Sequence, residues 1–384
     1  MCNEVARIMS TSQNLNSTFF HGKGERNFGI DLLKIISMYM VVQLHVLGCG
    51  GVLNACEMFS MKYYVAWFLE TSAFCAVDLF AMITGFVMVE KKVSGFRIIP
   101  LWLTVFFYST LIALFFYFIP ALSSLHKPTI TELFKSFTPV ASNQYWYFSS
   151  YFVMYFFIPY LNKFIVFCEK KCLEKLCLTI IILFSFVPIL SLYKIDAFGL
   201  KSGYSALWLM GCYVLGAYLK KYPLTICKTR CLIIFFVSVF CPWAIKLVTG
   251  LAMNACLNKA KDISMFVGYT SIFMIISSVA LISLFRQIDV KNDYCKKTLT
   301  YLSALSFSVY LIHTNPLVFK YILKDVFVFF PESHWGMLVI YVVTASSMIF
   351  AACLCIDSIR YFLFKILNVR KIPQLFERLL TTKG

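Results

Sequence analysis

The sequence predicts an all-α protein, a polytopic bundle of about ten transmembrane helices with both termini in the cytoplasm. Two observations on the whole chain predict this class. Of the 384 residues, 60% are hydrophobic and only 14% are charged, whereas a soluble domain carries about 25% charged residues. Long apolar stretches alternate with short basic segments. So few charges cannot cover a surface exposed to water, so lipid must be the solvent for most of the chain.

Ten apolar segments carry this prediction, and most are close to the ~20 residues that a helix needs to cross ~30 Å of hydrocarbon. They are expected at residues 30–48, 63–89, 98–120, 146–167, 173–193, 203–219, 231–250, 264–285, 300–319 and 335–364. Residues 1–27, which are polar, are expected to form a disordered cytoplasmic tail without a cleavable signal. Residues 28–365 then form one membrane domain. Residues 366–384 form a basic, amphipathic cytoplasmic tail on the anionic inner leaflet.

The orientation follows from where Lys and Arg fall. With the N-terminus inside, 23 of them lie on inner segments and 9 on outer loops, and the other three lie in or at the edge of spans. Cytoplasmic loops of membrane proteins collect Lys and Arg, so this bias predicts an even number of spans with both termini inside. It also accounts for the net charge of +17. No nucleic-acid partner is expected, because no basic stretch with interleaved aromatics lies outside the spans.

The fifteen cysteines are scattered, and most lie in apolar runs where Cys acts as a small hydrophobic residue. Cys168 and Cys172 have the i, i+4 spacing of half a metal site, but no second pair or histidine accompanies them. Neither a metal site nor a disulfide framework is therefore expected.

Three ionisable residues in the first span are candidates for function, because a charge at membrane depth costs at least ~2.5 kcal/mol. Asp31 and Lys34 are three residues apart and can pair on one helix face. His45 follows Lys34 by eleven residues, so the two share a face about 16 Å apart along the axis. An interfacial salt bridge and a structural histidine are the alternatives. Histidine is nevertheless the side chain best suited to general-base catalysis near neutral pH.

Asp78 lies in the middle of the second span, which also carries Glu70. A buried carboxylate needs a partner, and His45 or Lys34 is the expected one. In that arrangement Asp78 would fix the imidazole tautomer and stabilise the cation formed during proton transfer. A purely structural pair is the alternative.

Three cations follow the second span on the inner side: Lys91, Lys92 and Arg97. They suit the phosphates of an anionic ligand, although ordinary positive-inside charge explains them equally well.

Two other polar stretches interrupt the apolar pattern. His313 and Asn315 lie just before Pro316 in the ninth span, where a kink is expected. Their side chains either belong to a functional site or bond to the backbone carbonyls that the kink leaves free. Trp146 and Tyr147 open the fourth span, where they form an aromatic belt or line a sugar site.

Four stretches together resemble the acyltransferase-3 family of integral-membrane acyltransferases, which modify cell-surface carbohydrates. They are RNFGIDLLK at residues 26–34 leading to His45, VDLF through TGF at 77–86, WYF through PYLN at 146–162, and SFSVYLIH at 306–313. The chain departs from the family pattern at Ser94, where an Arg is frequent, and at Ala81 and Thr84.

This resemblance implies transfer of an acyl group, commonly acetyl, from cytoplasmic acyl-CoA to a hydroxyl of a sugar or lipid-linked glycan. It implies catalysis by His45, with Lys34 at the basic position of the first motif. It implies contact of Arg97 with the CoA phosphates, and Lys91 and Lys92 are candidates to replace the charge missing at Ser94. The expected location is a bacterial cytoplasmic membrane, and no metal is expected. His45 acts either as a base or as a transient acyl carrier.

Two other classes of protein remain as alternatives. A transporter or flippase for a small anion or glycan would also bury Asp, Lys and His, but would spread them over several broken helices near the midplane. A glycan polymerase or ligase would need a long outer loop rich in Arg and His, and the longest one here carries only His126, Lys127 and Lys135.

Overall fold

The computed structural model describes residues 26–190, 195–196, 198–257 and 266–381. Within these ranges every regular element is a helix, so the predicted all-α class is confirmed. The disordered tail predicted at residues 1–27 lies, except for its last two residues, outside the described part of the chain.

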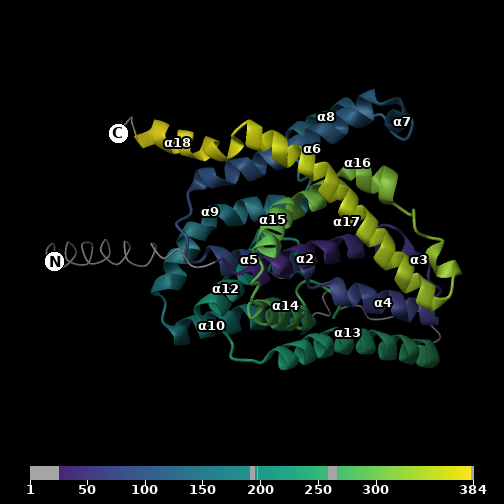
Figure 1. The fold of residues 1–384 in the computed structure, drawn as a ribbon. Coiled ribbons are helices and arrows are strands. Elements are labelled where there is room, and N and C mark those ends of the chain that lie inside the picture. Colours follow the sequence, from purple (N-terminus) through teal and green to yellow (C-terminus); the bar gives the residue numbers. More distant parts are fainter. Residues whose placement is uncertain (1–25, 191–194, 197, 258–265, 382–384) are drawn as a thin grey trace.

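The helices are numbered in chain order (Figure 1). The α-helices are α2 (Phe28–Leu47), α3 (Val52–Ala55), α4 (Met61–Ala73), α5 (Ala76–Met88), α6 (Ile99–Phe118), α7 (Pro120–Ser123), α8 (Ile130–Phe137), α9 (Trp146–Phe167), α10 (Lys170–Ile181), α11 (Val187–Leu190), α12 (Ala206–Lys221), α13 (Lys228–Leu257), α14 (Ile272–Phe285), α15 (Asp293–His313), α16 (Pro316–Val318), α17 (Trp335–Ile366) and α18 (Ile372–Thr381). Shorter 3₁₀ and π turns are η1 (Gly95–Ile98), η2 (Ile182–Phe186), η3 (Lys201–Gly203), η4 (Phe319–Leu323), η5 (Phe330–Glu332) and η6 (Val369–Lys371).

Each of the ten predicted apolar segments coincides with one or more of these helices. In the described residues, seven helices are long and apolar enough to cross a membrane. An eighth is added if α15 and the α16–η4 segment, bent by 55°, count as one span. α12 has 16 residues and α14 has 14. The chain is therefore polytopic, and the count of ten spans stays a prediction.

The second predicted span is not one continuous helix, because Phe74 and Cys75 separate α4 from α5. The hydroxyls of Thr71 and Ser72 donate to the carbonyls of Trp67 and Leu69, and such bonds compete with the helical backbone pattern. The Cys75 carbonyl in turn accepts a bond from Ser278 on α14. Hydroxyl groups thus make several contacts around the break, and a hydropathy profile does not detect them.

The loop expected at residues 121–145 contains two helices, α7 and α8, that were not predicted. α8 begins with a capping box in which the Thr129 side chain accepts from the Glu132 N–H and the Glu132 carboxylate accepts from the Thr129 N–H. The predicted C-terminal tail is also helical. Asn368, with a φ of 52°, turns the chain after α17 into η6 and α18.

α2 runs through the middle of the bundle (Figure 1), where it packs against α4, α5, α14, α15 and α17. The most extensive helix pair is α5 with α12. A Cβ on Gly216 would collide with the Met82 carbonyl oxygen, and one on Gly85 with that of Tyr213. Glycine at these positions lets the two backbones touch, as at many helix contacts in membranes.

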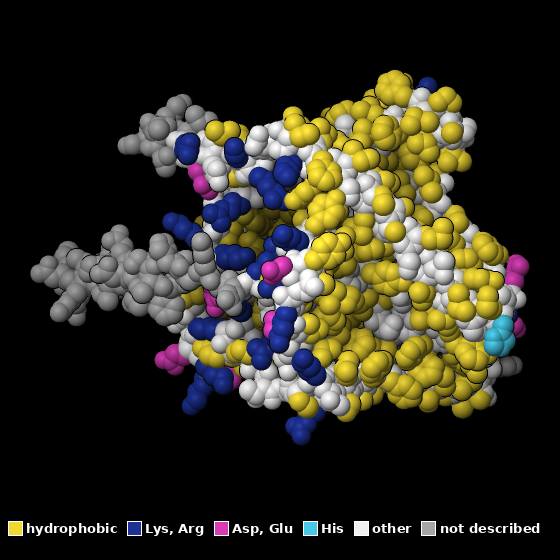
Figure 2. Space-filling model, in the orientation of Figure 1, with side chains coloured by type: hydrophobic (Ala, Val, Ile, Leu, Met, Phe, Trp, Pro, Cys, Tyr) yellow, Lys and Arg dark blue, Asp and Glu magenta, His cyan; other side chains and the backbone are white. Residues whose placement is uncertain are grey.

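The surface divides into an apolar body and one basic end (Figure 2). Lys and Arg side chains gather at the end where α18 lies, around a hollow, while hydrophobic side chains cover most of the remaining surface in this view. α2 begins at the same end. The two ends of the described chain therefore lie together, as an even number of crossings requires.

Candidate active site

Two helix ends bring a pair of histidines together inside the bundle. His45 lies in the last turn of α2, which ends where the Gly48 N–H donates to the Leu44 carbonyl. His313 is the last residue of α15, and Asn315 caps the next helix by accepting from the Leu317 N–H. Pro316 cannot continue α15, so the chain bends there. The kink predicted in this span is thus present and places His313 at its corner.

The hydrogen bonds of the pair assign its protons. His313 Nδ1 lies 2.5 Å from the Val309 carbonyl oxygen, which can only accept, so Nδ1 carries the proton. His313 Nε2 is then an acceptor in the neutral ring, and it lies 2.8 Å from His45 Nδ1, which must donate. The Nε2 of His45 is left with a free lone pair. This is the tautomer in which His45 can accept a proton from a substrate.

His45 faces a small cavity of about 60 Å³, called here the His45 pocket. Aromatic and aliphatic side chains line most of it: Met38, Val41, Leu44, Val77, Phe80, Trp146, Tyr147, Tyr204, Tyr269, Phe307 and Tyr310. Trp146 lies 4.3 Å from Tyr204 and 6.1 Å from Tyr269, measured between ring centroids. The cavity is therefore an aromatic-walled space with one imidazole as its basic group.

A second and larger cavity of about 440 Å³ lies nearer the basic end and is called here the basic pocket. Five cations line it: Arg97, Arg360, Lys365, Arg370 and Lys371. Phe307 lines both cavities. The two pockets therefore adjoin, with Phe307 between the cations and the histidine pair.

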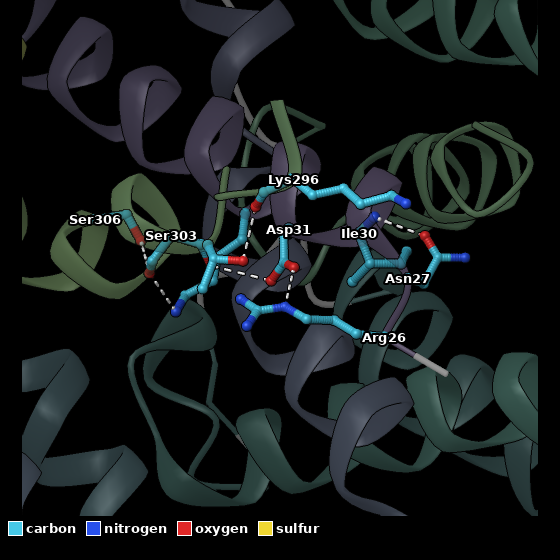
Figure 3. Close-up of polar contacts among 9 residues, drawn as sticks. Arg26, Asn27, Ile30, Asp31, Lys296, Ser303 and Ser306 are labelled. Atoms are coloured by element: carbon cyan, nitrogen blue, oxygen red, sulfur yellow. Dashed lines mark hydrogen bonds and ion pairs between the residues drawn. The ribbon is translucent and has the colours of Figure 1, made fainter. Parts of the chain in front are cut away.

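The structure places Asp31 in a different network with Arg26 and Ser303 (Figure 3), and Lys34 joins it through Ser303. Asp31 accepts from Arg26 Nε at 2.5 Å and from the Ser303 hydroxyl at 3.2 Å. Lys34 Nζ donates to the Ser303 carbonyl at 2.9 Å. The expected Asp31–Lys34 ion pair is therefore wrong, because Arg26 takes that place. The network ties α2 to α15, and neither residue lines the His45 pocket or the basic pocket.

The expected pairing of Asp78 with His45 or Lys34 is also wrong. Asp78 is fully buried and accepts from Trp208 Nε1 on α12 at 2.8 Å, with the Cys212 thiol 3.9 Å away. Val77 and Phe80 line the His45 pocket, but Asp78 does not. The Trp208 bond ties α5 to α12, and the catalytic role expected of Asp78 stays a prediction.

The other predicted site residues divide between the two cavities. Trp146 and Tyr147 line the His45 pocket, and Arg97 lines the basic pocket. Asn315 lines neither cavity, and its side-chain amide donates to the Tyr145 hydroxyl at 2.9 Å. Lys91 and Lys92 are exposed and line neither cavity. Desolvation of its ammonium group lowers the pKa of Lys91, and the nearby cations Arg26, Lys220 and Arg97 add to that effect.

Several lining residues were not predicted, and two of them carried a signal in the sequence. Tyr204 and Tyr269 each follow a glycine and precede a serine that caps a helix, Ser205 for α12 and Ser271 for α14. Gly203 has a φ of 97° and lies against the Tyr269 side chain. The similar sequences GYS (203–205) and GYTS (268–271) stand at the N-termini of α12 and α14, and the tyrosine of each lines the same cavity. The C-terminal cations gave no comparable signal.

The fold and the site define a membrane-embedded protein that holds a hydrogen-bonded histidine pair beside a small aromatic pocket. The chain belongs to the family described as an acyltransferase domain, which matches residues 27–357. This is the acyltransferase-3 family that the sequence motifs resemble, so that prediction is confirmed and the protein is a membrane acyltransferase. No curated protein and no solved structure gives a significant match to the chain.

Proposed function

We propose that this protein is an O-acyltransferase of the bacterial cytoplasmic membrane. It moves an acetyl group from cytoplasmic acetyl-CoA to a hydroxyl of a cell-surface or lipid-linked carbohydrate. The observation that carries the proposal is the His45–His313 pair, which leaves His45 Nε2 free to take a proton at the wall of the His45 pocket.

His45 acts as the general base on this proposal. Its Nε2 takes the proton of the acceptor hydroxyl as the oxygen attacks the thioester carbonyl. The C–S bond then breaks, the acyl group stays on the acceptor oxygen, and CoA leaves as a thiolate that takes the proton back from His45. His313 holds the ring in the required tautomer through the 2.8 Å bond. Transient acylation of His45 is the other possible course.

The size of the His45 pocket supports acetyl over longer acyl groups. Its volume of about 60 Å³ is several times the ~10–15 Å³ that one water molecule needs, and so suits a group of a few atoms. The aromatic faces of Trp146, Tyr204 and Tyr269 are the proposed contacts of the acceptor sugar.

The basic pocket is the proposed entrance for the donor. Arg97 lies in it, and its guanidinium donates to the Lys92 carbonyl at 3.1 Å, which holds it at the start of α6. Because Phe307 lines both cavities, an acyl-CoA whose phosphates lie among these cations can extend its pantetheine arm toward His45.

The test uses the purified full-length protein with labelled acetyl-CoA and a crude glycan or lipid-linked glycan acceptor. His45→Ala should lower the transfer rate by at least ~100-fold, the lower range for loss of a general base. His334→Asn is the matched control, because it keeps an N-cap for α17 and lies outside both pockets. Full transfer by folded His45→Ala protein would contradict the assignment. Failure of the wild-type protein to bind or consume acetyl-CoA would overturn the proposed function.

A further inference from the structure

The chain continues past the family match at residue 357 into a segment that lines the basic pocket. This segment contributes Arg360, Lys365, Arg370 and Lys371, whereas the matched domain contributes only Arg97 among the cations. Most of the positive charge in the cavity therefore comes from residues that lie outside the acyltransferase domain.

Four of these five cations have no acidic ion-pair partner among the described residues. Arg360 is 8% exposed and donates to both oxygens of the buried Asp357, at 2.6 and 2.8 Å, and the Tyr108 hydroxyl also donates to Asp357. In the described part of the chain, no acidic side chain forms an ion pair with the remaining four, Arg97, Lys365, Arg370 and Lys371. Figure 2 shows Lys and Arg gathered around a hollow at this end of the molecule. Such a cavity attracts a ligand that carries several negative charges.

The segment is fixed in place by contacts with the matched domain. Asn368 turns the chain after α17, Val369 is buried, and the Lys371 N–H donates to the Asn368 carbonyl at 2.8 Å. α18 then packs on η1, where the Phe376 ring stacks on that of Phe96 at 5.8 Å. The adjacent Arg97 belongs to the same 3₁₀ turn as Phe96. The packing of α18 on η1 thus helps to bring Arg370 and Lys371 into the lining of the same cavity as Arg97.

We propose that Lys365, Arg370 and Lys371 bind the phosphates of the acyl-CoA donor together with Arg97. This rests on the proposed function, since it assumes that the basic pocket admits the donor. Lys and Arg bind phosphate oxygens through charge-assisted hydrogen bonds. Four cations that line one cavity of about 440 Å³, without an ion-pair partner in the described part of the chain, suit the clustered phosphates of the nucleotide end. The uncharged arm then runs past Phe307 to His45.

The experiment compares two donors, acetyl-CoA and S-acetyl-pantetheine, which carries the thioester but no phosphate. In Arg370→Ala/Lys371→Ala protein, the ratio of kcat/KM for acetyl-CoA to that for S-acetyl-pantetheine should fall about tenfold, the loss of roughly one charge-assisted hydrogen bond. The dissociation constant of CoA should rise by a similar factor. Arg230→Ala is the matched control, because Arg230 is an exposed cation outside both pockets, and its ratio should equal that of the wild-type protein.

Three results would overturn this inference while leaving the proposed function intact. One is an unchanged donor ratio and unchanged CoA binding in the double variant. Another is an equal loss with both donors, which would mean that the segment only supports the fold. The third is a selective loss seen in phosphatidylglycerol vesicles and absent from lipid-free detergent, which would assign the cations to lipid headgroups. By contrast, a wild-type protein that neither binds CoA nor transfers acetyl would refute the proposed function itself.

Discussion

At the scale of single residues, His313 affects the reaction only through His45. Its Nδ1–H is used by the Val309 carbonyl, so its Nε2 can only accept, and this fixes the proton of His45 on Nδ1. His313 is therefore a positioning residue. Its side chain is 2% exposed and does not line the His45 pocket.

This role predicts different effects for two substitutions at position 313. His313→Leu removes the acceptor and should lower kcat by about 100-fold, because His45 is then free to adopt the wrong tautomer. His313→Gln keeps a side-chain oxygen that can accept from His45 and should recover part of the loss. The KM for acetyl-CoA should change little in either variant. Equal activity of the two variants, measured by initial rates on folded protein, would show that the hydrogen bond has no part in catalysis.

Many of the site residues could be predicted from residue types, but the hydrogen-bond partners of these residues could not. His45, His313 and the aromatic pair Trp146 and Tyr147 are conspicuous in an apolar chain, and the structure brings them to one place. Which buried polar groups meet depends on how each helix is rotated. Asp78 faces Trp208 rather than His45 for that reason, and a hydropathy profile contains no information on helix rotation.

At the scale of elements, the α5–α12 contact supports one wall of the His45 pocket. α5 contributes Val77 and Phe80 to that wall, and the Trp208–Asp78 bond fastens the two helices together. The helices themselves were predictable because their apolar segments are long. The α4–α5 break and α8 were not, although the Thr129 to Glu132 spacing of α8 is a typical capping box.

Gly216 is the position at which this contact can be tested. Gly216→Ala places a Cβ against the Met82 carbonyl and should destabilise the protein by about 1–3 kcal/mol, the usual cost of overpacking. Gly268→Ala is the control, because nothing lies within 4 Å of its added Cβ. The measurement is thermal unfolding in detergent. Equal melting temperatures for the two variants would mean that α5 and α12 do not pack as closely as described.

At the scale of the whole molecule, the gathering of charge at one end gives the protein a direction in the membrane. The basic end carries α18, the start of α2 and the basic pocket. Lys and Arg concentrate on the cytoplasmic side of membrane proteins, so this end is expected to face the acyl-CoA of the cytoplasm. The count of Lys and Arg along the sequence already predicted this orientation, because that count needs only the order of the loops and spans.

Reporter fusions test the orientation in a bacterial host. A fluorescent protein fused after Gly384 should fluoresce, and alkaline phosphatase fused at the same point should be inactive, since the C-terminus is expected inside. Phosphatase inserted next to Lys127, between α7 and α8, should be active. An active phosphatase at the C-terminus would reverse the assignment of the two sides.

α17 is longer than the hydrocarbon core of a bilayer is thick. Its 32 residues span about 48 Å at 1.5 Å per residue, against a core of ~30 Å. The surplus must be taken up by tilt or must project into the headgroup layer. Because Lys365 lies in the last turn of the helix and Arg370 follows it, these cations are expected at headgroup depth. A polyanion held by them would avoid the dehydration that entry into the hydrocarbon demands, and only its neutral arm would have to enter the membrane interior.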